Sequence, residues 1–283
     1  MSPAEIKATL TRLGVRPNKR LGQHFLIDRA ALQAIVEAAD LKRGDVVLEV
    51  GPGLGVLTGA LLDHGARVTA IEQDRTFVAY LEKIYPDLTV SHGDAATIHW
   101  HDIVGVKPWK FVSNLPYSIT SLALRKALWA PRPADRVVVL VQREVAERAV
   151  ARSGKTSLLS LMVALASRSA RIIRRVPAGA FYPPPKVESA VLEIVPMPWS
   201  DREKRWGIDP EKVMEVAKRG FAHPRKQLAS NLASPLHVLA QRAAPVQGKE
   251  AVVSVLVSLG LDPKTRAEDL SPDEWAKLTI ALH

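Results

Sequence analysis

The stretch Val46-Val-Leu-Glu-Val-Gly-Pro-Gly-Leu-Gly55 indicates the fold of the first part of the chain. Its first five residues are mostly apolar, as expected for a buried parallel strand. The three glycines that follow permit a tight turn in which the backbone approaches a ligand closely, and a helix is expected from about Val56 to Asp63. This order of strand, glycine-rich turn and helix predicts a Rossmann-like α/β domain.

An acidic residue ends the next apolar strand, Arg67–Ile71. Glu72 lies 21 residues after Gly51, an interval at which a carboxylate can accept the two ribose hydroxyls of an adenosine-containing cofactor. The dinucleotide-binding pattern would place Gly or Ala at position 56, where this chain has Val. Because the strand also carries Glu49, the motif resembles that of S-adenosylmethionine-dependent methyltransferases. A dinucleotide oxidoreductase is the less favoured alternative.

Asp94 follows another expected strand, Leu88–Ser91, in the sequence Gly93-Asp94-Ala95. Its carboxylate can accept a hydrogen bond from the amino group of a cofactor's adenine. It can equally well cap the turn that follows the strand.

The stretch Phe111-Val-Ser-Asn-Leu-Pro-Tyr117 brings an amide, a carbonyl and an aromatic ring to the end of a further strand. Pro116 fixes its own φ and biases Leu115 toward an extended conformation, so the Leu115 carbonyl has no helix or ladder partner. Asn114 Oδ1 and this carbonyl can accept the two hydrogens of an exocyclic amine, while Tyr117 stacks on the ring that carries it. The alternative is a tight turn with Tyr117 in the core.

The remaining patterns suggest two domains. Arg136–Gln142 and Ala190–Val195 predict further strands, whereas residues 1–20 form a basic lead-in with no predicted element. Residues 196–209 contain two prolines and mixed charges and are typical of a linker, and the patterns after them are helical. We therefore expect an α/β domain at 1–199 and a small all-α domain at 200–283.

The charge of the chain favours a polyanionic partner such as nucleic acid. The net charge is +10 and the pI is near 9.9; a basic but merely soluble protein is the alternative. Basic residues exceed acidic ones in 1–30, 141–180 and 201–230, but not in 231–283. Aromatic residues make up only 5% of the chain, so we expect one or two bases to be bound individually rather than a long stacked run.

Composition also excludes several kinds of site. The chain has no cysteine, which excludes disulfides, cysteine-ligated zinc and iron–sulfur clusters. The histidines near Trp100 have no acidic partner at a ligand spacing, so we expect no metal site. The first residues lack a signal-peptide pattern and the longest apolar runs are too short for a bilayer, so we expect a cytoplasmic protein without membrane association.

Nine segments together resemble one family. In order, they are Leu21-Gly-Gln-His-Phe-Leu26, Glu49-Val-Gly-Pro-Gly-Leu-Gly55, Glu72, Gly93-Asp94-Ala95, Asn114-Leu-Pro-Tyr117, Gln142-Arg-Glu-Val-Ala146, Phe181-Tyr-Pro-Pro-Pro-Lys-Val-Glu-Ser189, Arg225-Lys226 and Leu261-Asp-Pro-Lys-Thr-Arg-Ala-Glu268. The order is similar to that of KsgA-type ribosomal RNA small-subunit adenine dimethyltransferases. The family often has Asn where this chain has His24, and Tyr-Gly, at an RNA contact, where it has Thr156-Ser157.

The resemblance implies a seven-stranded class I methyltransferase domain and a small helical domain that contacts RNA. It implies that four methyl groups pass from S-adenosylmethionine to two adjacent adenines near the 3′ end of 16S rRNA, in an immature 30S particle, and we expect a monomer. It places the cofactor on His24, Leu26, Gly51, Glu72, Asp94 and Asn114.

The segment Asn114–Tyr117 would then hold an extruded adenine. Asn114 and Leu115 accept the N6 hydrogens, Pro116 shapes the turn, Tyr117 stacks on one face, and Phe181 is the candidate for the other face. An Erm-type enzyme, which dimethylates a 23S rRNA adenine, shares Asn-Leu-Pro-Tyr and the glycine turn and is the nearest alternative. A ribosome-assembly factor in which catalysis is secondary is the alternative of a different class.

Overall fold

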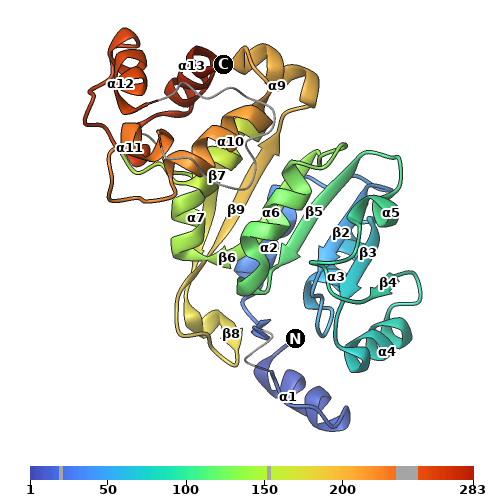
Figure 1. Cartoon of the computed structure of the whole chain (residues 1–283). Coiled ribbons are helices and arrows are strands. Elements are labelled where there is room, and N and C mark those ends of the chain that lie inside the picture. Colours follow the sequence, from blue (N-terminus) through green and yellow to red (C-terminus); the bar gives the residue numbers. More distant parts are fainter. Residues whose placement is uncertain (19–21, 152–153, 234–247) are drawn as a thin grey trace. The chain divides into compact units, whose positions relative to one another are not determined.

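The computed structural model describes residues 1–18, 22–151, 154–233 and 248–283. The basic pair at 19–20 and Leu21 of the first motif lie outside the described residues. The chain forms two compact units, one of Met1–Glu147 with Arg168–Pro196 and one of Arg148–Ser167 with Met197–His283 (Figure 1). The expected boundary at 199/200 lies close to the observed change at 196/197, but residues 148–167 belong to the second unit.

The first unit is built on a seven-stranded sheet in the order β4-β3-β2-β5-β6-β9-β7. Its strands are β2 (Val46–Val50), β3 (Arg67–Glu72), β4 (Thr89–His92), β5 (Trp109–Asn114), β6 (Arg136–Gln142), β7 (Ser167–Val176) and β9 (Ser189–Pro196). The pairs from β4 to β6 are parallel, and β9 runs antiparallel to β6. This sheet confirms the predicted Rossmann-like fold.

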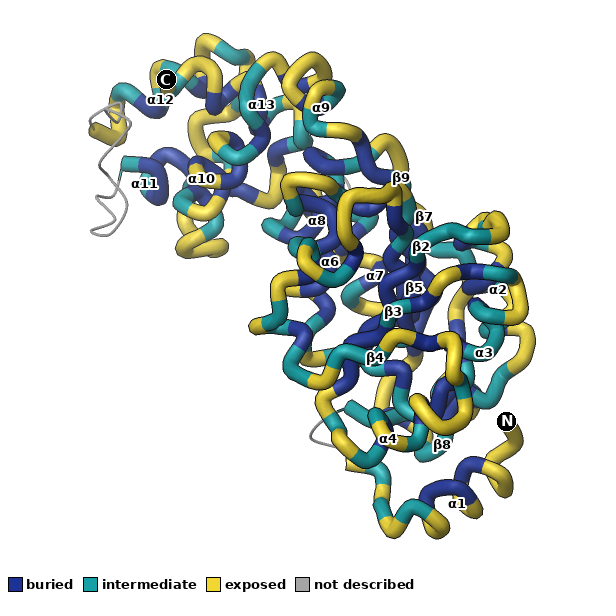
Figure 2. The backbone as a smooth tube through the Cα atoms, turned by 90° about the vertical axis from the view of Figure 1, so that its right-hand side faces the viewer, coloured by how far each residue is buried: buried dark blue, intermediate teal, exposed yellow. Residues whose placement is uncertain are grey.

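The sheet is stable because its middle strands are apolar on both faces. All five residues from Val137 to Val141 are fully buried, and β2, β3 and β5 run through the most buried part of the unit (Figure 2). Helices α2 (Arg29–Ala39) and α3 (Val56–Asp63) share a core with them, in which Ile35 and Leu61 are fully buried. Helix α4 (Arg75–Ile84) follows β3.

Two helices of the first unit lie where the sequence suggested none. Helix α1 (Pro3–Arg12) begins with a capping box between Ser2 and Glu5, and its Ile6 and Leu10 are buried. Helix α5 (Trp100–Val104) lies among the histidines, where no element was predicted, and its Trp100 is buried against Phe111. The sequence did not indicate these two helices because burial of a few apolar side chains stabilises short helices that have little intrinsic pattern.

The second unit is helical among its described residues, which confirms that part of the predicted fold class. It contains α8 (Leu158–Ala166), α9 (Trp199–Trp206), α10 (Pro210–Gly220), α11 (Leu228–Leu232), α12 (Lys249–Ser258) and α13 (Pro272–Leu282). Helix α9 lies in the expected linker, because Trp206 Nε1 donates to the Leu165 carbonyl at 3.0 Å and the buried Arg202 donates to the Met197 carbonyl at 2.8 Å. Apolar α8 packs against α10 and α13, which explains why residues 148–167 join this unit.

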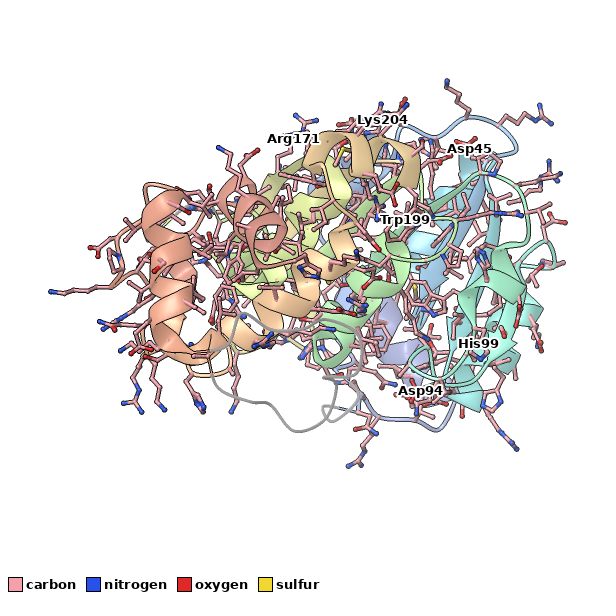
Figure 3. The ribbon with its side chains drawn as sticks, turned by 45° about the horizontal axis from the view of Figure 1, so that its top comes forward. Asp45, Asp94, His99, Arg171, Trp199 and Lys204 are labelled. Atoms are coloured by element: carbon pink, nitrogen blue, oxygen red, sulfur yellow. The ribbon has the colours of Figure 1, made fainter. Side chains whose placement is uncertain are left out.

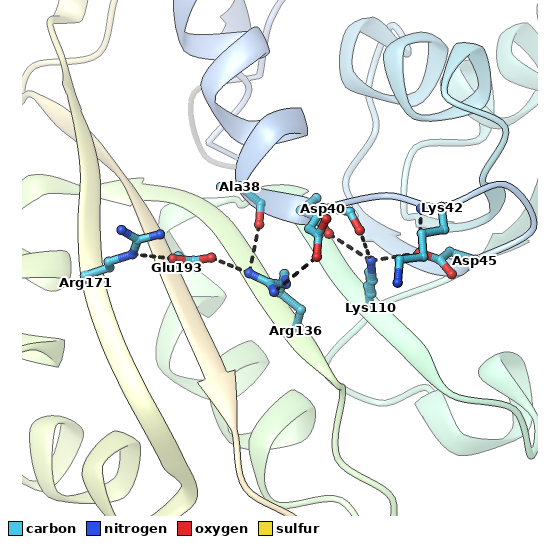
Figure 4. Close-up of polar contacts among 9 residues, drawn as sticks. Ala38, Asp40, Lys42, Asp45, Lys110, Arg136, Arg171 and Glu193 are labelled. Atoms are coloured by element: carbon cyan, nitrogen blue, oxygen red, sulfur yellow. Dashed lines mark hydrogen bonds and ion pairs between the residues drawn. The ribbon is translucent and has the colours of Figure 1, made fainter.

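A network of ion pairs lies at the amino ends of β5 and β6 (Figure 4). Glu193, only 4% exposed, accepts from Arg136 and Arg171, and Arg136 also contacts Asp40. The ammonium group of Lys110 lies 2.8 Å from Asp45 and donates to the carbonyls of residues 39 and 40. Ion pairs and charged hydrogen bonds therefore stabilise the end of the sheet at which β5 and β6 begin.

Candidate active site

A cavity lies at the carboxyl ends of the parallel strands in the first unit. It is lined by residues from five separate segments, within 22–26, 49–57, 71–77, 93–95 and 114–119. They meet because parallel strands bring their carboxyl ends to one edge of the sheet. Figure 3 shows Asp94 at this edge and Asp45 at the other. The predicted site residues that line the cavity are His24, Leu26, Gly51, Glu72, Asp94, Asn114, Leu115, Pro116 and Tyr117.

The glycine turn, residues 51–55, packs closely against two other parts of the unit. One is the substrate segment, by which we mean Asn114–Tyr117, and the other is the carboxyl end of α4. Gly51 has φ +70°, and a Cβ there would lie 3.1 Å from Pro116 Cγ. Gly55 has φ +75°, and a Cβ there would lie 2.5 Å from the ring of Tyr85. The positive φ favours glycine at both positions, and the lack of space adds to this at Gly55.

Glu72 ends β3 and holds the glycine turn in place. Its Oε2 accepts from the Gly53 amide at 3.1 Å, and its Oε1 accepts from the Asp74 amide at 2.9 Å. Burial raises the pKa of Glu72, and these backbone donors act in the opposite direction. Each carboxylate oxygen has a second acceptor site, so the side chain can still accept ligand hydroxyls.

Glu49 lies beneath the turn and is almost fully buried, 1% exposed. Thr58 Oγ1 donates to its Oε2 at 2.6 Å. Burial raises the pKa of Glu49 to about 8, and the nearby Glu72 adds to the effect. Glu49 is therefore mostly protonated at neutral pH, which avoids two adjacent buried negative charges.

Asp94 follows β4 and uses one carboxylate oxygen locally. Its Oδ1 accepts from the Ala96 amide at 2.8 Å, which is the turn contact that the sequence offered as an alternative. Oδ2 accepts no hydrogen bond from the described residues, and Asp94 lines the cavity. The local contact therefore leaves one oxygen for a ligand.

The amide of Asn114 is oriented by a residue far away in the sequence. Its Nδ2 donates to the His24 carbonyl at 3.1 Å, so Oδ1 is the atom left for a ligand. The Leu115 amide donates to the Leu140 carbonyl at 3.1 Å, whereas the Leu115 carbonyl accepts nothing from the described residues. Pro116, with φ −55° and ψ 125°, keeps the backbone extended at this point. Two consecutive residues that line the cavity thus each have an acceptor without a partner among the described residues.

Tyr117 is half-buried and is held by contacts to its hydroxyl and to its ring. Its hydroxyl lies 2.7 Å from Ser189 Oγ at the start of β9, and burial raises its pKa. The His24 ring stacks beside it, with centroids 5.9 Å apart and planes at 25°. His24 Nδ1 is engaged with the Pro183 carbonyl at 2.7 Å, which leaves Nε2 as the imidazole atom able to meet a cofactor.

Phe181 does not line the cavity, so the expectation that it forms a second stacking wall has to be corrected. The side chain is 2% exposed and packs in the core with Leu26 and Ile35. It lies in β8 (Phe181–Tyr182), which pairs with β1 (Phe25–Leu26). A ring with this burial offers no face to a base.

Other residues of the site were not found from the sequence. Ser189 anchors Tyr117, and the ring of Phe25 meets that of Phe77 edge-on at 5.9 Å in the cavity wall. Phe77 lies on the apolar face of α4, which was visible as a pattern, but its place beside the cavity was not. These contacts join positions far apart in sequence, so no local motif indicates them.

A family model described as "Ribosomal RNA adenine dimethylase" matches residues 14–280. The chain belongs to this family. Among curated proteins, "Ribosomal RNA small subunit methyltransferase A" of Dehalococcoides mccartyi (strain ATCC BAA-2100 / JCM 16839 / KCTC 5957 / BAV1) is 40% identical and covers 98% of this chain and 92% of its own. The protein of that name from Myxococcus xanthus (strain DK1622) is 38% identical, with coverage of 99% and 95%.

Solved structures agree with the sequence relatives. A dimethyladenosine transferase from Plasmodium falciparum matches 90% of this chain and 96% of its own, with a TM-score of 0.71 and 27% identity. The 23S rRNA methyltransferase ErmE matches 91% and 99%, with a TM-score of 0.64 and 26% identity. Membership of the rRNA adenine dimethylase family confirms the predicted resemblance, the class I methyltransferase fold and the predicted class of enzyme.

In the part of the chain that the structure describes, no helix is long and apolar enough to cross a membrane. No group of three or more His, Cys, Asp or Glu side chains there could hold a metal ion.

Proposed function

We propose that this dimethylase transfers methyl groups from S-adenosylmethionine to N6 of two adjacent adenines near the 3′ end of 16S rRNA. The observation that carries the proposal is the pair of acceptors, Asn114 Oδ1 and the Leu115 carbonyl, beside a glycine turn and two carboxylates in one cavity. The curated relatives named above, which act on small-subunit rRNA by name, support the choice of RNA.

The residues present fit S-adenosylmethionine. Gly51 and Gly53 present backbone without side chains to the cavity, and Glu72 and Asp94 offer acceptors for ribose hydroxyls and an adenine amine. The set that would hold the cofactor is His24, Leu26, Gly51, Glu72, Asp94 and Asn114. When bound, it supplies an electrophilic methyl group on a sulfonium.

The acceptor pair addresses the main difficulty of the reaction. Adenine N6 is a poor nucleophile because its lone pair is delocalised into the ring. Hydrogen bonds from N6 to Asn114 Oδ1 and to the Leu115 carbonyl favour a pyramidal nitrogen whose lone pair is directed at the methyl group. The nitrogen becomes cationic and acidic after attack, so no dedicated general base is needed, and catalysis rests on positioning and electrostatics.

Tyr117 supplies the stacking face for the extruded base. Extrusion costs a few kcal/mol, and stacking contributes about 1–3 kcal/mol per base, so a ring already held by Ser189 can offset much of this cost. With Phe181 in the core, the base has one stacking ring rather than two. The pocket must accept the first methyl group during the second transfer, and the small Ser118 beside Tyr117 is compatible with this.

The partner that we propose is an immature 30S particle, bound by a monomer. The net charge of +10 supports binding to a phosphate-rich surface. The Erm-type alternative predicts methylation of the large subunit, and the same experiment distinguishes the two.

The test uses purified small and large subunits that lack the modification, with tritiated S-adenosylmethionine. We expect label in small subunits only, at two adjacent adenines that mass spectrometry identifies as N6,N6-dimethyladenine. Label in large subunits would overturn the choice of RNA, and no label in either would overturn the proposed activity. Free 16S rRNA, tested in parallel, shows whether the particle is required.

A further inference from the structure

Lys126 joins helix α6 (Thr120–Leu128) to the loop that carries Asp94. Its Nζ donates to the Ala95 carbonyl at 2.9 Å and to the Ile98 carbonyl at 2.8 Å. The same ammonium group lies 5.7 Å from the centroid of the Trp100 ring. All of these contacts lie within one compact unit.

The loop is pinned at the residue that follows Asp94. The Ala95 carbonyl accepts from Trp100 Nε1 at 3.0 Å as well as from Lys126. On the other side of Asp94, the Gly93 amide donates to the Glu72 carbonyl at 2.9 Å. Asp94 therefore lies between two residues whose backbone is held, Gly93 by the Glu72 carbonyl and Ala95 by Lys126.

The environment of Lys126 is costly for an ammonium group, which indicates a specific role. Burial lowers the pKa of Lys126, and the Asp94 carboxylate acts in the opposite direction. Two carbonyl dipoles and an aromatic face compensate for the lost hydration. A lysine that only favoured solubility would extend its ammonium group into water.

Helix α6 also connects this lysine to the substrate segment. The helix begins directly after the short 3₁₀ turn Tyr117–Ile119, and Thr120 Oγ1 donates to the Tyr117 carbonyl at 3.2 Å. Helix α6 thus contacts the turn of the stacking tyrosine at its amino end and carries Lys126 near its carboxyl end.

We propose that Lys126 is a positioning residue for the cofactor, holding the Asp94 carboxylate where it accepts the hydrogen bond of the adenine amino group. This inference rests on the proposed function. Lys126 thereby contributes to the affinity for the cofactor and to the selectivity for adenine over bases that lack the amino group.

The test substitution is Lys126→Met, which keeps an unbranched side chain of nearly the same length and removes its charge. A matched control exists in the same unit. Lys110 also donates to two backbone carbonyls, at the opposite edge of the sheet, so Lys110→Met removes comparable contacts far from the cavity. Calorimetry would measure binding of S-adenosylhomocysteine and of its inosine counterpart, in which an oxygen replaces the adenine amine.

We expect Lys126→Met to weaken binding of S-adenosylhomocysteine by about 10- to 100-fold, because it removes two charge-assisted hydrogen bonds that hold the loop of Asp94. The preference for adenosine over inosine should fall toward one, as it should in Asp94→Ala. Lys126→Arg should retain much of the affinity for S-adenosylhomocysteine and much of the base preference. Lys110→Met should change neither the affinity nor the preference.

Unchanged affinity and unchanged base preference in Lys126→Met would overturn the inference. If that variant does not fold, Trp100→Phe, which removes the other donor to Ala95, must lower the base preference, and an unchanged preference in it would also overturn the inference. Failure of the unsubstituted protein to bind S-adenosylhomocysteine would instead overturn the proposed function.

Discussion

Asn114 shows how one side chain can have its chemistry set by a distant backbone atom. Because its Nδ2 donates to the His24 carbonyl, the orientation of the amide is fixed and Oδ1 is the atom that faces the ligand. That arrangement costs no reorganisation when the base arrives, which is the condition under which a polar group contributes most to catalysis.

Asn114→Ala should therefore reduce methyl transfer by about 10²–10³-fold, as the loss of one preorganised polar group does in other enzymes. Binding of S-adenosylhomocysteine should change far less, because the glycine turn and the two carboxylates remain. Single-turnover assays with tritiated cofactor and calorimetry would measure the two quantities. Near-normal turnover in the variant would contradict the role given to this amide.

Ser189→Ala tests the anchoring of Tyr117. Loss of one hydrogen bond is worth about 0.5–1.5 kcal/mol, so we expect a 2- to 10-fold fall in kcat/KM for the rRNA substrate with unchanged cofactor affinity. Tyr117→Phe should have a similar effect, and the double variant should be no worse than either single variant, since both remove the same bond. Strictly additive effects would show that the two hydroxyls act separately.

Glu49 makes the stability of the first unit depend on pH. Its pKa is raised from 4.5 to about 8, so between these values the folded protein holds a proton that the unfolded chain has released. Raising the pH across this interval therefore favours unfolding, by roughly 1.4 kcal/mol per unit of pKa difference. Glu49→Gln, which stays neutral, should gain stability relative to the unsubstituted protein between pH 5 and pH 8.5, and a pH-independent difference in melting temperature would contradict this.

At the scale of elements, the sequence indicated the strands and the glycine turn because they have strong local patterns. Buried parallel strands are continuous apolar runs, and their carboxyl ends meet whatever the loops do, so the convergence of Gly51, Glu72, Asp94 and Asn114 could be anticipated. The pairing of β1 with β8 could not, because it joins Phe25 to Tyr182 across most of the chain. The misplacement of Phe181 follows directly from that unseen pairing.

Helix α1 braces the cavity wall. Ile6 and Leu10 pack in a core with Phe25, Leu54 and Phe77, and a Cβ on Gly53 would lie only 3.0 Å from Phe25. The helix begins with the Ser2–Glu5 capping box, but a helix of this length is stable only when its apolar face has a partner.

Ile6→Ala should lower the free energy of unfolding by about 2–5 kcal/mol, the usual cost of truncating a buried aliphatic side chain. It should also weaken cofactor binding several-fold, because Phe25 and Phe77 lose support on the side away from the ligand. The exposed neighbour Lys7 provides the control, and Lys7→Ala should change neither quantity. Thermal melting and calorimetry would measure both, and full cofactor affinity in a destabilised Ile6→Ala would show that α1 serves stability alone.

At the scale of the whole molecule, the excess of basic residues is carried by both units. In the first unit, β7 carries the exposed side chains of Arg168, Arg171, Arg174 and Arg175. In the second, Arg225 and Lys226 are exposed, and the Leu228 amide donates to the Thr265 carbonyl at 2.8 Å, which brings their segment beside that of Arg266. Apart from Arg266, these residues lie in the ranges 141–180 and 201–230 that the charge pattern of the sequence singled out. We expect all of them to contact rRNA phosphates.

If they do, affinity for small-subunit particles must fall steeply with salt, because each neutralised phosphate releases counterions. Six or more contacts would cost about 10³-fold or more between 50 and 200 mM salt. Arg225→Ala and Lys226→Ala should each reduce the slope of log K against log salt by about one. Lys83→Ala, a change at an exposed lysine on α4, should leave the slope unchanged. A flat salt dependence would mean that the charge of +10 does not recruit the RNA, and recognition would then have to rest on shape and on the extruded base alone.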